Sequence, residues 1–259
     1  MIDNIFDSHA HYDDEQFDGD REELLRSLPS KGVCAVINCA SDLKSSATSA
    51  ELSEKYPFFW CACGVHPHEA EKELKTADIN EIEKRIVNFA EKKKCVAIGE
   101  IGIDYHYDFS PRELQKELFE LQLKLSKELD LPVIVHDREA HEDTMTLLKK
   151  YRPKGVVHCF SGSVEMAREV LKLGMYIGGA VTFKNAKKPV AVAAATDIDR
   201  ILLETDCPYM APVPFRGTRC SSDMIAYSAQ TIASVKNMDV QTLVDAATEN
   251  TKRLFGIEF

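Results

Sequence analysis

Short apolar runs alternate with longer amphipathic segments along the whole chain. The runs are rich in Val, Ile, Phe and Cys, and most are apolar on both faces, which is typical of strands in a buried parallel sheet. They predict eight strands, at residues 5–9, 33–39, 58–63, 95–100, 132–136, 156–160, 175–178 and 201–204.

The segments between these runs have helical periodicity. Leucines spaced by three and four residues predict one buried helix face, formed by Leu114, Leu118, Leu121, Leu125 and Leu129. Ser110-Pro111-Arg112-Glu113 predicts a capping box at the start of that helix, with proline at its first position. Asp78 and Asp239 predict the starts of two further helices.

Eight strands alternating with helices predict parallel pairing through right-handed crossovers. An α/β fold of the (β/α)8 TIM barrel type, with parallel strands and outer helices, explains this number best. The alternative is an open doubly wound sheet, which would place a glycine-rich turn after the first strand, where His9-Ala10-His11 stands. Because no linker or repeat interrupts the chain, we predict one domain over residues 1–259, a normal length for such a barrel.

Side chains that bind metals stand at the carboxyl ends of five of the predicted strands. Taken singly, each is more often a hydrogen-bonded or capping residue, but six at equivalent barrel positions make chance implausible. Since the active site of such barrels lies at this end of the strands, we expect one metal site. Its predicted ligands are His9, His11, Glu100, His136, His158 and Asp206.

Four imidazoles and two carboxylates exceed one tetrahedral shell, and they predict two divalent ions about 3.5–4 Å apart. Glu100 is the predicted bridge between the ions, because a carboxylate has two oxygens. Asp206 is predicted to bind metal and to accept the proton of an activated water. Both are therefore the predicted catalytic residues of a metal-assisted hydrolysis. The donors suit Mg, Mn or Zn, and the sequence does not choose among these metals.

Composition limits the partners. The formal net charge is −10, whereas a protein that coats duplex DNA is more often basic, so any nucleic-acid contact is expected to be local. Eight cysteines, most of them in apolar runs, predict buried thiols in a reducing compartment. Without a targeting signal or a run of membrane-spanning length, we expect a cytoplasmic protein that makes no membrane contact.

Motifs spread over nearly the whole chain resemble, in family order, those of the TatD family of metal-dependent deoxyribonucleases, within the amidohydrolase-like barrels. The matching stretches are residues 7–11, 64–68, 98–105, 131–136, 158–162, 182–185, 203–209, 214–217 and 248–250. The resemblance implies a 3′-to-5′ exonuclease or endonuclease acting on single-stranded or damaged DNA, in repair or in degradation of broken DNA. It implies metal roles for the same six residues.

The chain departs from the family pattern after Arg216-Gly217, where the family continues with a basic residue and then Asn-Glu-Pro. Here the sequence reads Arg219-Cys220-Ser221-Ser222.

Other residues are predicted to hold a DNA substrate. His66 and Arg216 are predicted to contact phosphate oxygens. Tyr105 and His106 follow the fourth strand and are predicted to stack on an unpaired base. A basic rim is predicted from Lys184, Lys187, Lys188 and Arg219. We expect DNA as the partner and a monomeric protein.

Two other functions compete with a nuclease. A metallohydrolase of a small amide or ester would share the fold and the ligands, but it would not need a basic rim. Most amidohydrolases also bridge their metals with a modified lysine, where Glu100 stands here. A nucleic-acid-binding scaffold with a decayed site is disfavoured, because no ligand position is substituted.

Overall fold

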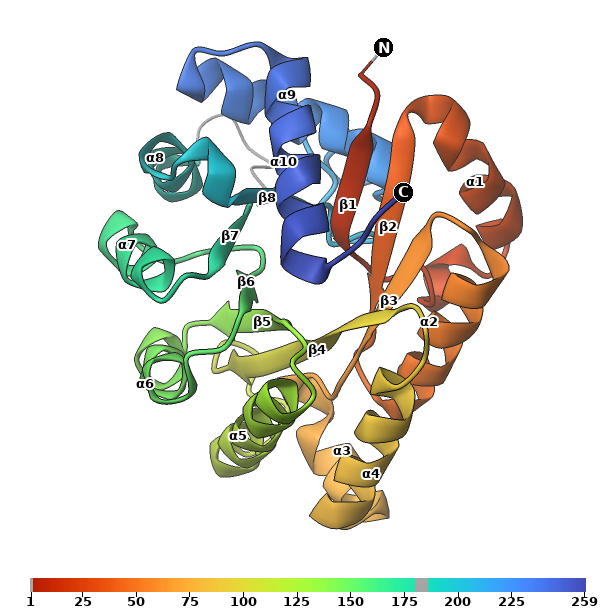
Figure 1. Cartoon of the computed structure of the whole chain (residues 1–259), viewed down its shortest axis with the longest axis vertical. Helices are drawn as coiled ribbons and strands as arrows, with labels where there is room; N and C mark the ends of the chain where they lie inside the picture. Colours follow the sequence, from red (N-terminus) through yellow and green to blue (C-terminus); the bar gives the residue numbers. More distant parts are fainter. Residues whose placement is uncertain (1, 180–185) are drawn as a thin grey trace. The chain divides into compact units, whose positions relative to one another are not determined.

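The computed structural model describes residues 2–179 and 186–259 (Figure 1). Lys184 and the motif at residues 182–185 lie outside these ranges. The described residues form an eight-stranded sheet in which the strands follow one another in chain order. This order, with helices between parallel strands, is that of a (β/α)8 barrel, so the predicted fold class is confirmed. The strands are β1 (Ile5–Ala10), β2 (Val33–Cys39), β3 (Phe59–Cys63), β4 (Cys95–Asp104), β5 (Val133–Arg138), β6 (Gly155–Val157), β7 (Tyr176–Gly179) and β8 (Ile201–Leu203).

The α-helices in the described ranges are α1 (Arg21–Ser27), α2 (Leu43–Lys55), α3 (Ala70–Thr76), α4 (Ile79–Ala90), α5 (Arg112–Glu128), α6 (His141–Tyr151), α7 (Val164–Lys172), α8 (Lys187–Ala195), α9 (Ile225–Lys236) and α10 (Val240–Phe255). The predicted starts at Asp78 and Asp239 are confirmed. Each carboxylate accepts a hydrogen bond from a backbone N–H in the first turn of its helix.

The strand ends that differ most from prediction are those of β4 and β6. β4 continues four residues past Glu100, because its end pairs with β5 as far as Asp104 opposite Arg138. β6 ends at Val157 rather than at residue 160. Cys159 has φ 41°, in the left-handed region, which takes the backbone out of the extended conformation.

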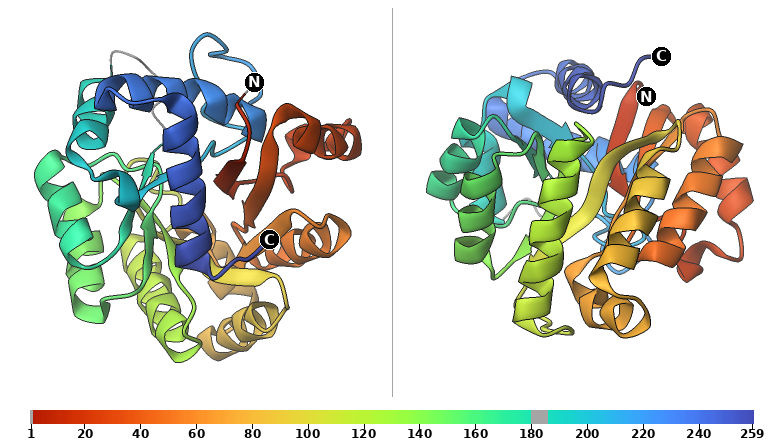
Figure 2. Two further views of the ribbon diagram at one scale, coloured as in Figure 1. Left: turned by 45° about the horizontal axis from the view of Figure 1, so that its top comes forward. Right: turned by 60° about the horizontal axis from the view of Figure 1, so that its bottom comes forward.

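By its internal contacts the chain divides into two compact units, each described here by itself. The single domain predicted over residues 1–259 stays a prediction. One unit consists of residues 39–158 and 172–175, and within it α5 lies along β4 (Figure 2). The buried face of α5 includes Gln115, Leu118, Phe119, Gln122 and Leu125. Leu114, Leu121 and Leu129 of the predicted stripe lie at its half-buried margins, so the predicted face is correct only in part.

The capping box predicted at Ser110 is wrong. Pro111 precedes the first residue of α5, and no side chain caps the helix. The hydroxyl of Ser110 is used in the loop instead: it donates to the carbonyl of His68 at 2.8 Å and accepts from the N–H of Glu71 at 3.0 Å. A buried hydroxyl that two loop groups occupy is not available to the helix.

The other unit consists of residues 1–38, 159–171 and 176–259, and in it α10 crosses β1 and β8 (Figure 1). Two residues of the motif at 248–250 hold these elements together. Thr248 donates to the carbonyl of Asn4 at 2.7 Å, just before β1. Asn250 donates to the carbonyls of Ile198 and Ile201, at 2.7 and 2.9 Å. The motif therefore has a structural use.

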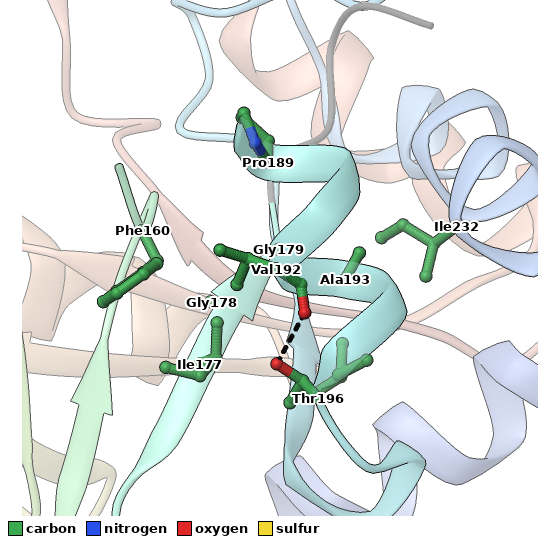
Figure 3. Close-up of a pocket in the computed structure, with 10 residues that line it drawn as sticks. Phe160, Ile177, Gly178, Gly179, Pro189, Val192, Ala193, Thr196 and Ile232 are labelled. Atoms are coloured by element: carbon green, nitrogen blue, oxygen red, sulfur yellow. Dashed lines mark hydrogen bonds between the residues drawn. The ribbon is translucent and has the colours of Figure 1, made fainter. Parts of the chain in front are cut away.

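This second unit also contains a small apolar pocket (Figure 3). It lies where β7 and β8 meet α8 and α9, and its lining includes Ile177, Val192, Thr196 and Ile232. Thr196 satisfies its hydroxyl by donating to the carbonyl of Val192 at 2.8 Å. The lining contains no ionisable side chain, so the pocket is a feature of packing.

The segment that departs from the family pattern contributes to the core of this unit. Ser222 is fully buried and donates to Asp7 at 2.7 Å, beside Thr205, which donates to the same oxygen at 2.6 Å. Arg219 forms an ion pair with Asp20 and lies over the ring of Phe17, and these contacts hold it against its own unit.

We predict that Ser222→Ala destabilises the protein. Burial raises the pKa of Asp7 to about 6, although the bonds from Thr205 and Ser222 lower it. Losing a hydrogen bond to this buried carboxyl should reduce the free energy of unfolding by about 1–3 kcal/mol, measured by urea denaturation. Ser30→Ala, at an exposed hydroxyl, is the control and should change it by about 0.5 kcal/mol or less. Equal effects of the two substitutions would contradict the structural role of Ser222.

All eight cysteines lie among the described residues and are free thiols, and six of them are buried. Their apolar surroundings match the predicted structural use. None of the helices in the described ranges combines the length and the apolar character needed to cross a membrane.

Candidate metal centre

The residues predicted to bind metal fall into two clusters, one in each unit. The first cluster, which we call the Asp206 cluster, joins His9, His11 and Asp206. The two Nε2 atoms lie 3.0 Å apart, and they lie 3.6 and 3.4 Å from Oδ1 of Asp206. His9 is fully buried, and the side chain of Asp206 is 19% exposed. Three ligand atoms therefore converge on one point, and the side chains of both His11 and Asp206 are partly exposed there.

Backbone pairing brings this cluster together. The segment after β8 bonds to the end of β1: the N–H of Asp206 donates to the carbonyl of His9 at 3.0 Å, and that of His11 donates to Cys207 at 2.8 Å. Asp206 has φ 60°, a left-handed conformation that aspartate tolerates better than most residues. Alternation along β1 then puts His9 and His11 on the same face, as predicted.

The second cluster, the Glu100 cluster, gathers three imidazoles around one carboxylate oxygen. Oε1 of Glu100 lies 2.7 Å from Nε2 of His158, 2.9 Å from Nδ1 of His136 and 3.5 Å from Nε2 of His66. Glu100 is buried, and the chain after β6 is held in place because the N–H of His158 donates to the carbonyl of Val135 at 3.0 Å.

Asp104, at the end of β4, supports the Glu100 cluster from behind. Its Oδ2 lies 3.1 Å from Nε2 of His136 and 2.8 Å from Nε2 of His68. Its Oδ1 accepts the backbone N–H groups of His106 and Tyr107, both at 2.9 Å. One fully buried carboxylate thus orients two imidazoles and the start of the following loop. An acceptor at Nε2 leaves Nδ1 of His136 to face Glu100, which is the usual carboxylate–histidine arrangement behind a metal ligand.

Two buried glutamines of α5 fix the loops that carry these residues. Gln122 accepts the N–H of Val65 at 2.7 Å and donates to its carbonyl at 3.0 Å, which holds the residue before His66. Gln115 accepts the N–H of Asp104 at 2.9 Å. The glutamine side chains thus satisfy backbone groups of Val65 and Asp104.

His66 is held as a neutral donor. Its Nδ1 accepts the N–H of His68 at 3.2 Å, so in the neutral ring the proton is on Nε2. Burial lowers the pKa of His66 to about 4, although Glu100 opposes the shift. A buried N–H beside Glu100 is the donor that the predicted contact with a phosphate oxygen requires.

Charge in the Glu100 cluster is balanced by imidazole. Burial alone would lower the pKa of His136, but the hydrogen bonds to Asp104 and Glu100 raise it to about 9. Burial likewise opposes ionisation of Asp104, yet bonds from His136, from the N–H of Tyr107 and from His68 lower its pKa. Two buried carboxylates around one imidazole thus favour a positive charge at this place.

The donor sets of both clusters fit a divalent ion. Ligand bonds of about 2.1 Å place neighbouring ligand atoms about 3.0–3.5 Å apart, and the distances above are close to this range. Both His9-His11-Asp206 and His66-Glu100-His136 bring three possible ligand atoms within 4.8 Å of one another. That Glu100 bridges two ions stays a prediction.

Comparison with known proteins places the chain. The family described as TatD related DNase matches residues 6–256. The chain belongs to the TatD family. A TatD-family metal-dependent hydrolase of Bacillus subtilis named YabD, itself uncharacterized, is 42% identical over 98% of this chain and 99% of its own length. The TatD protein of Escherichia fergusonii, named a 3′-5′ ssDNA/RNA exonuclease, is 30% identical over 98% of this chain and 100% of its own.

The crystal structure of YjjV, a TatD homologue from Escherichia coli, superimposes with a TM-score of 0.89. Its sequence is 32% identical, and the match covers 100% of both chains. This likeness agrees with the barrel order of the strands. The protein is thus a TatD-family metal-dependent hydrolase.

Of the described residues that are predicted to bind substrate, His66 is the one that lies in either candidate cluster. Tyr105 donates its hydroxyl to Asp143 and lies under the guanidinium of Arg112, 4.1 Å from the ring centroid. His106 is exposed and bonds to Glu139 at 2.8 Å. Arg216 is also exposed, and it donates to the carbonyl of Ala211 at 2.9 Å. The substrate roles of these three residues stay predictions.

Sequence reasoning missed Asp104 and His68 as partners of the metal site. The signal for Asp104 was its place at the end of an apolar run that continues past Glu100, through Ile101 and Ile103. For His68 the sequence favours a solvated loop residue over a phosphate contact, whereas the loop brings its Nε2 to Asp104.

Proposed function

We propose that this TatD-family protein is a metal-dependent deoxyribonuclease that hydrolyses phosphodiester bonds of single-stranded or damaged DNA, in the 3′-to-5′ direction. The observation that supports it most is the convergence of imidazole and carboxylate atoms in the Asp206 and Glu100 clusters. The named activity of the Escherichia fergusonii relative supports the choice of substrate. The predicted role in DNA repair, the cytoplasmic location and the monomeric state stay predictions.

Six side chains would hold two divalent ions, of Mg, Mn or Zn: His9, His11, Glu100, His136, His158 and Asp206. Bound ions would supply a nucleophilic water at neutral pH and neutralise charge on the reacting phosphate. The donor types and the family membership support these proposed roles.

The protein's own groups complete the proposed reaction. Asp206 is the partly exposed carboxylate of its cluster, and it accepts the proton of the attacking water. Glu100 supplies the negative charge of the Glu100 cluster. His66 donates its Nε2–H to a phosphate oxygen, and Arg216 binds a neighbouring phosphate with its planar guanidinium.

A hydrolysis assay tests this function. We expect the protein to shorten 5′-labelled single-stranded DNA from its 3′ end in the presence of Mg²⁺ or Mn²⁺, and we expect a chelator to abolish cleavage. The reason is that a bound metal ion lowers the pKa of its water to about 7, which supplies hydroxide at neutral pH, and a chelator removes that ion. Re-adding metal after dialysis is the control and should restore cleavage. Cleavage that continues at full rate in chelator would contradict the proposal.

A further inference from the structure

Two exposed aromatic rings stand on the loop between β4 and α5, in the unit that contains the Glu100 cluster. Tyr107 is 48% exposed and Phe109 is 65% exposed. Two large aromatic side chains that stay exposed two residues apart call for an explanation, because burying each would stabilise the fold. Neither ring was singled out by its position in the sequence.

The two rings form an ordered surface. Their centroids lie 5.3 Å apart with an interplanar angle of 23°, so the rings are stacked. The ring of His68 meets both edge-on, at 5.4 Å from Tyr107 and 4.9 Å from Phe109. The guanidinium carbon of Arg138 lies 5.0 Å from the Tyr107 centroid. The stack therefore runs from Arg138 through Tyr107 to Phe109, its most exposed member.

The stack is attached to the metal ligands through one side chain. Oδ1 of Asp104 fixes the backbone of Tyr107, and Oδ2 holds His68 and His136. The centroids of His68 and His136 lie 6.1 Å apart. One imidazole thus separates the aromatic stack from a predicted metal ligand.

We propose that Tyr107 and Phe109 form a stacking platform for an unpaired base of the DNA strand whose phosphate is cleaved. This proposal rests on the proposed nuclease function and adds the part of the substrate that the platform recognises. An aromatic ring stacks on any base, so the platform accepts all four bases and favours single strands, whose base faces are open. Arg138 adds a cation in a chain of net charge −10. Its guanidinium lies over the Tyr107 ring and forms no ion pair with the described residues, so it is suited to a nearby phosphate.

The platform differs from the stacking predicted for Tyr105 and His106. Tyr105 is occupied by Asp143 and Arg112, and His106 meets Tyr107 edge-on at 4.8 Å. The most exposed ring therefore belongs to Phe109, with Tyr107 stacked behind it.

The test compares two substrates of equal length: an oligothymidylate and an oligomer of abasic deoxyribose phosphates. Both carry the same phosphates, and only the first carries bases. For the wild-type protein with Mn²⁺, we expect KM to be about 5- to 150-fold lower for the oligothymidylate. Phe109→Ala should raise KM for the oligothymidylate towards the abasic value and leave KM for the abasic oligomer and kcat for both nearly unchanged. Phe109→Trp should restore the low KM, because it keeps a stacking surface.

Phe259→Ala is the matched control, since Phe259 is a phenylalanine with similar exposure, 58%, in the other unit. It should leave KM unchanged for both substrates. If Phe109→Ala raises KM equally for both oligomers, the rings only support the loop and the platform is wrong. If wild type cleaves both oligomers with the same KM, no base is bound and the platform is again wrong, while the nuclease stands. If wild type cleaves neither oligomer, the proposed function itself has failed.

Discussion

Replacing Asp206 with asparagine is expected to reduce kcat for single-stranded DNA by about 10²- to 10⁴-fold, the usual contribution of a general base. The amide keeps an oxygen where Oδ1 lies, 3.4 Å from Nε2 of His11, but it loses the charge and the proton affinity of the carboxylate. Asparagine also tolerates the left-handed backbone found at this position, so the fold should persist. Initial rates with saturating metal measure the effect.

The matched control is Asp18→Asn, which removes an exposed carboxylate that pairs with Arg21 in the same unit. Exposed ion pairs contribute little to stability, so kcat and the free energy of unfolding should both stay near the wild-type values. The circular dichroism spectrum and the melting temperature of Asp206→Asn must also match wild type. A variant that is folded and fully active would exclude Asp206 from the reaction.

The second large effect is expected for Asp104→Asn, through metal affinity. The new amide oxygen still accepts the N–H groups of His106 and Tyr107, but its NH₂ now faces the imidazoles of His68 and His136. A lost acceptor behind a metal-binding histidine usually weakens metal affinity by about 10- to 100-fold. We expect activity to fall at limiting Mn²⁺ and to recover substantially at saturating Mn²⁺.

That recovery separates a positioning residue from a catalytic one, because a missing catalytic group is not replaced by more metal. Isothermal titration with Mn²⁺ gives the affinity directly, without turnover. Asp108→Asn is the control, since Asp108 lies on the same loop and pairs with Arg112 at the surface. If Asp104→Asn bound metal as tightly as wild type, the contact of Asp104 with His136 would not contribute to metal affinity.

The pattern of apolar runs predicted the strands and their order because a parallel sheet buried on both faces leaves few polar positions inside a strand. It assigned the end of β4 to Glu100, the first charged residue in the run. The structure buries that charge within the strand, and the run continues to Asp104. A buried carboxylate within a strand is thus the feature that a hydrophobic pattern represents least well.

The predicted leucine face of α5 was only partly correct for a related reason: polar residues are buried on that helix. Glutamine is usually exposed, so the pattern treated Gln115 and Gln122 as solvent-facing. The predicted buried face was therefore rotated away from the observed one, which includes both glutamines. Their side-chain amides are buried because they bond to the backbone of Val65 and Asp104, which are distant in the sequence. Such bonds do not change the periodicity of apolar residues, so the pattern cannot predict them. The predicted metal ligands could be proposed from the sequence, because each lies near or just after the end of a predicted strand.

The spacing of those two glutamines has a consequence for engineering. Gln115 and Gln122 are seven residues apart, which is about two helical turns or about 10.5 Å. The length of α5 between them therefore fixes the distance between their contacts with the loop before His66 and with the end of β4. Inserting one residue between Gln115 and Gln122 would rotate one amide by about 100° away from its loop. Redesign of substrate preference should therefore vary the exposed loop tip at Tyr107 and Phe109 and leave the length of α5 untouched.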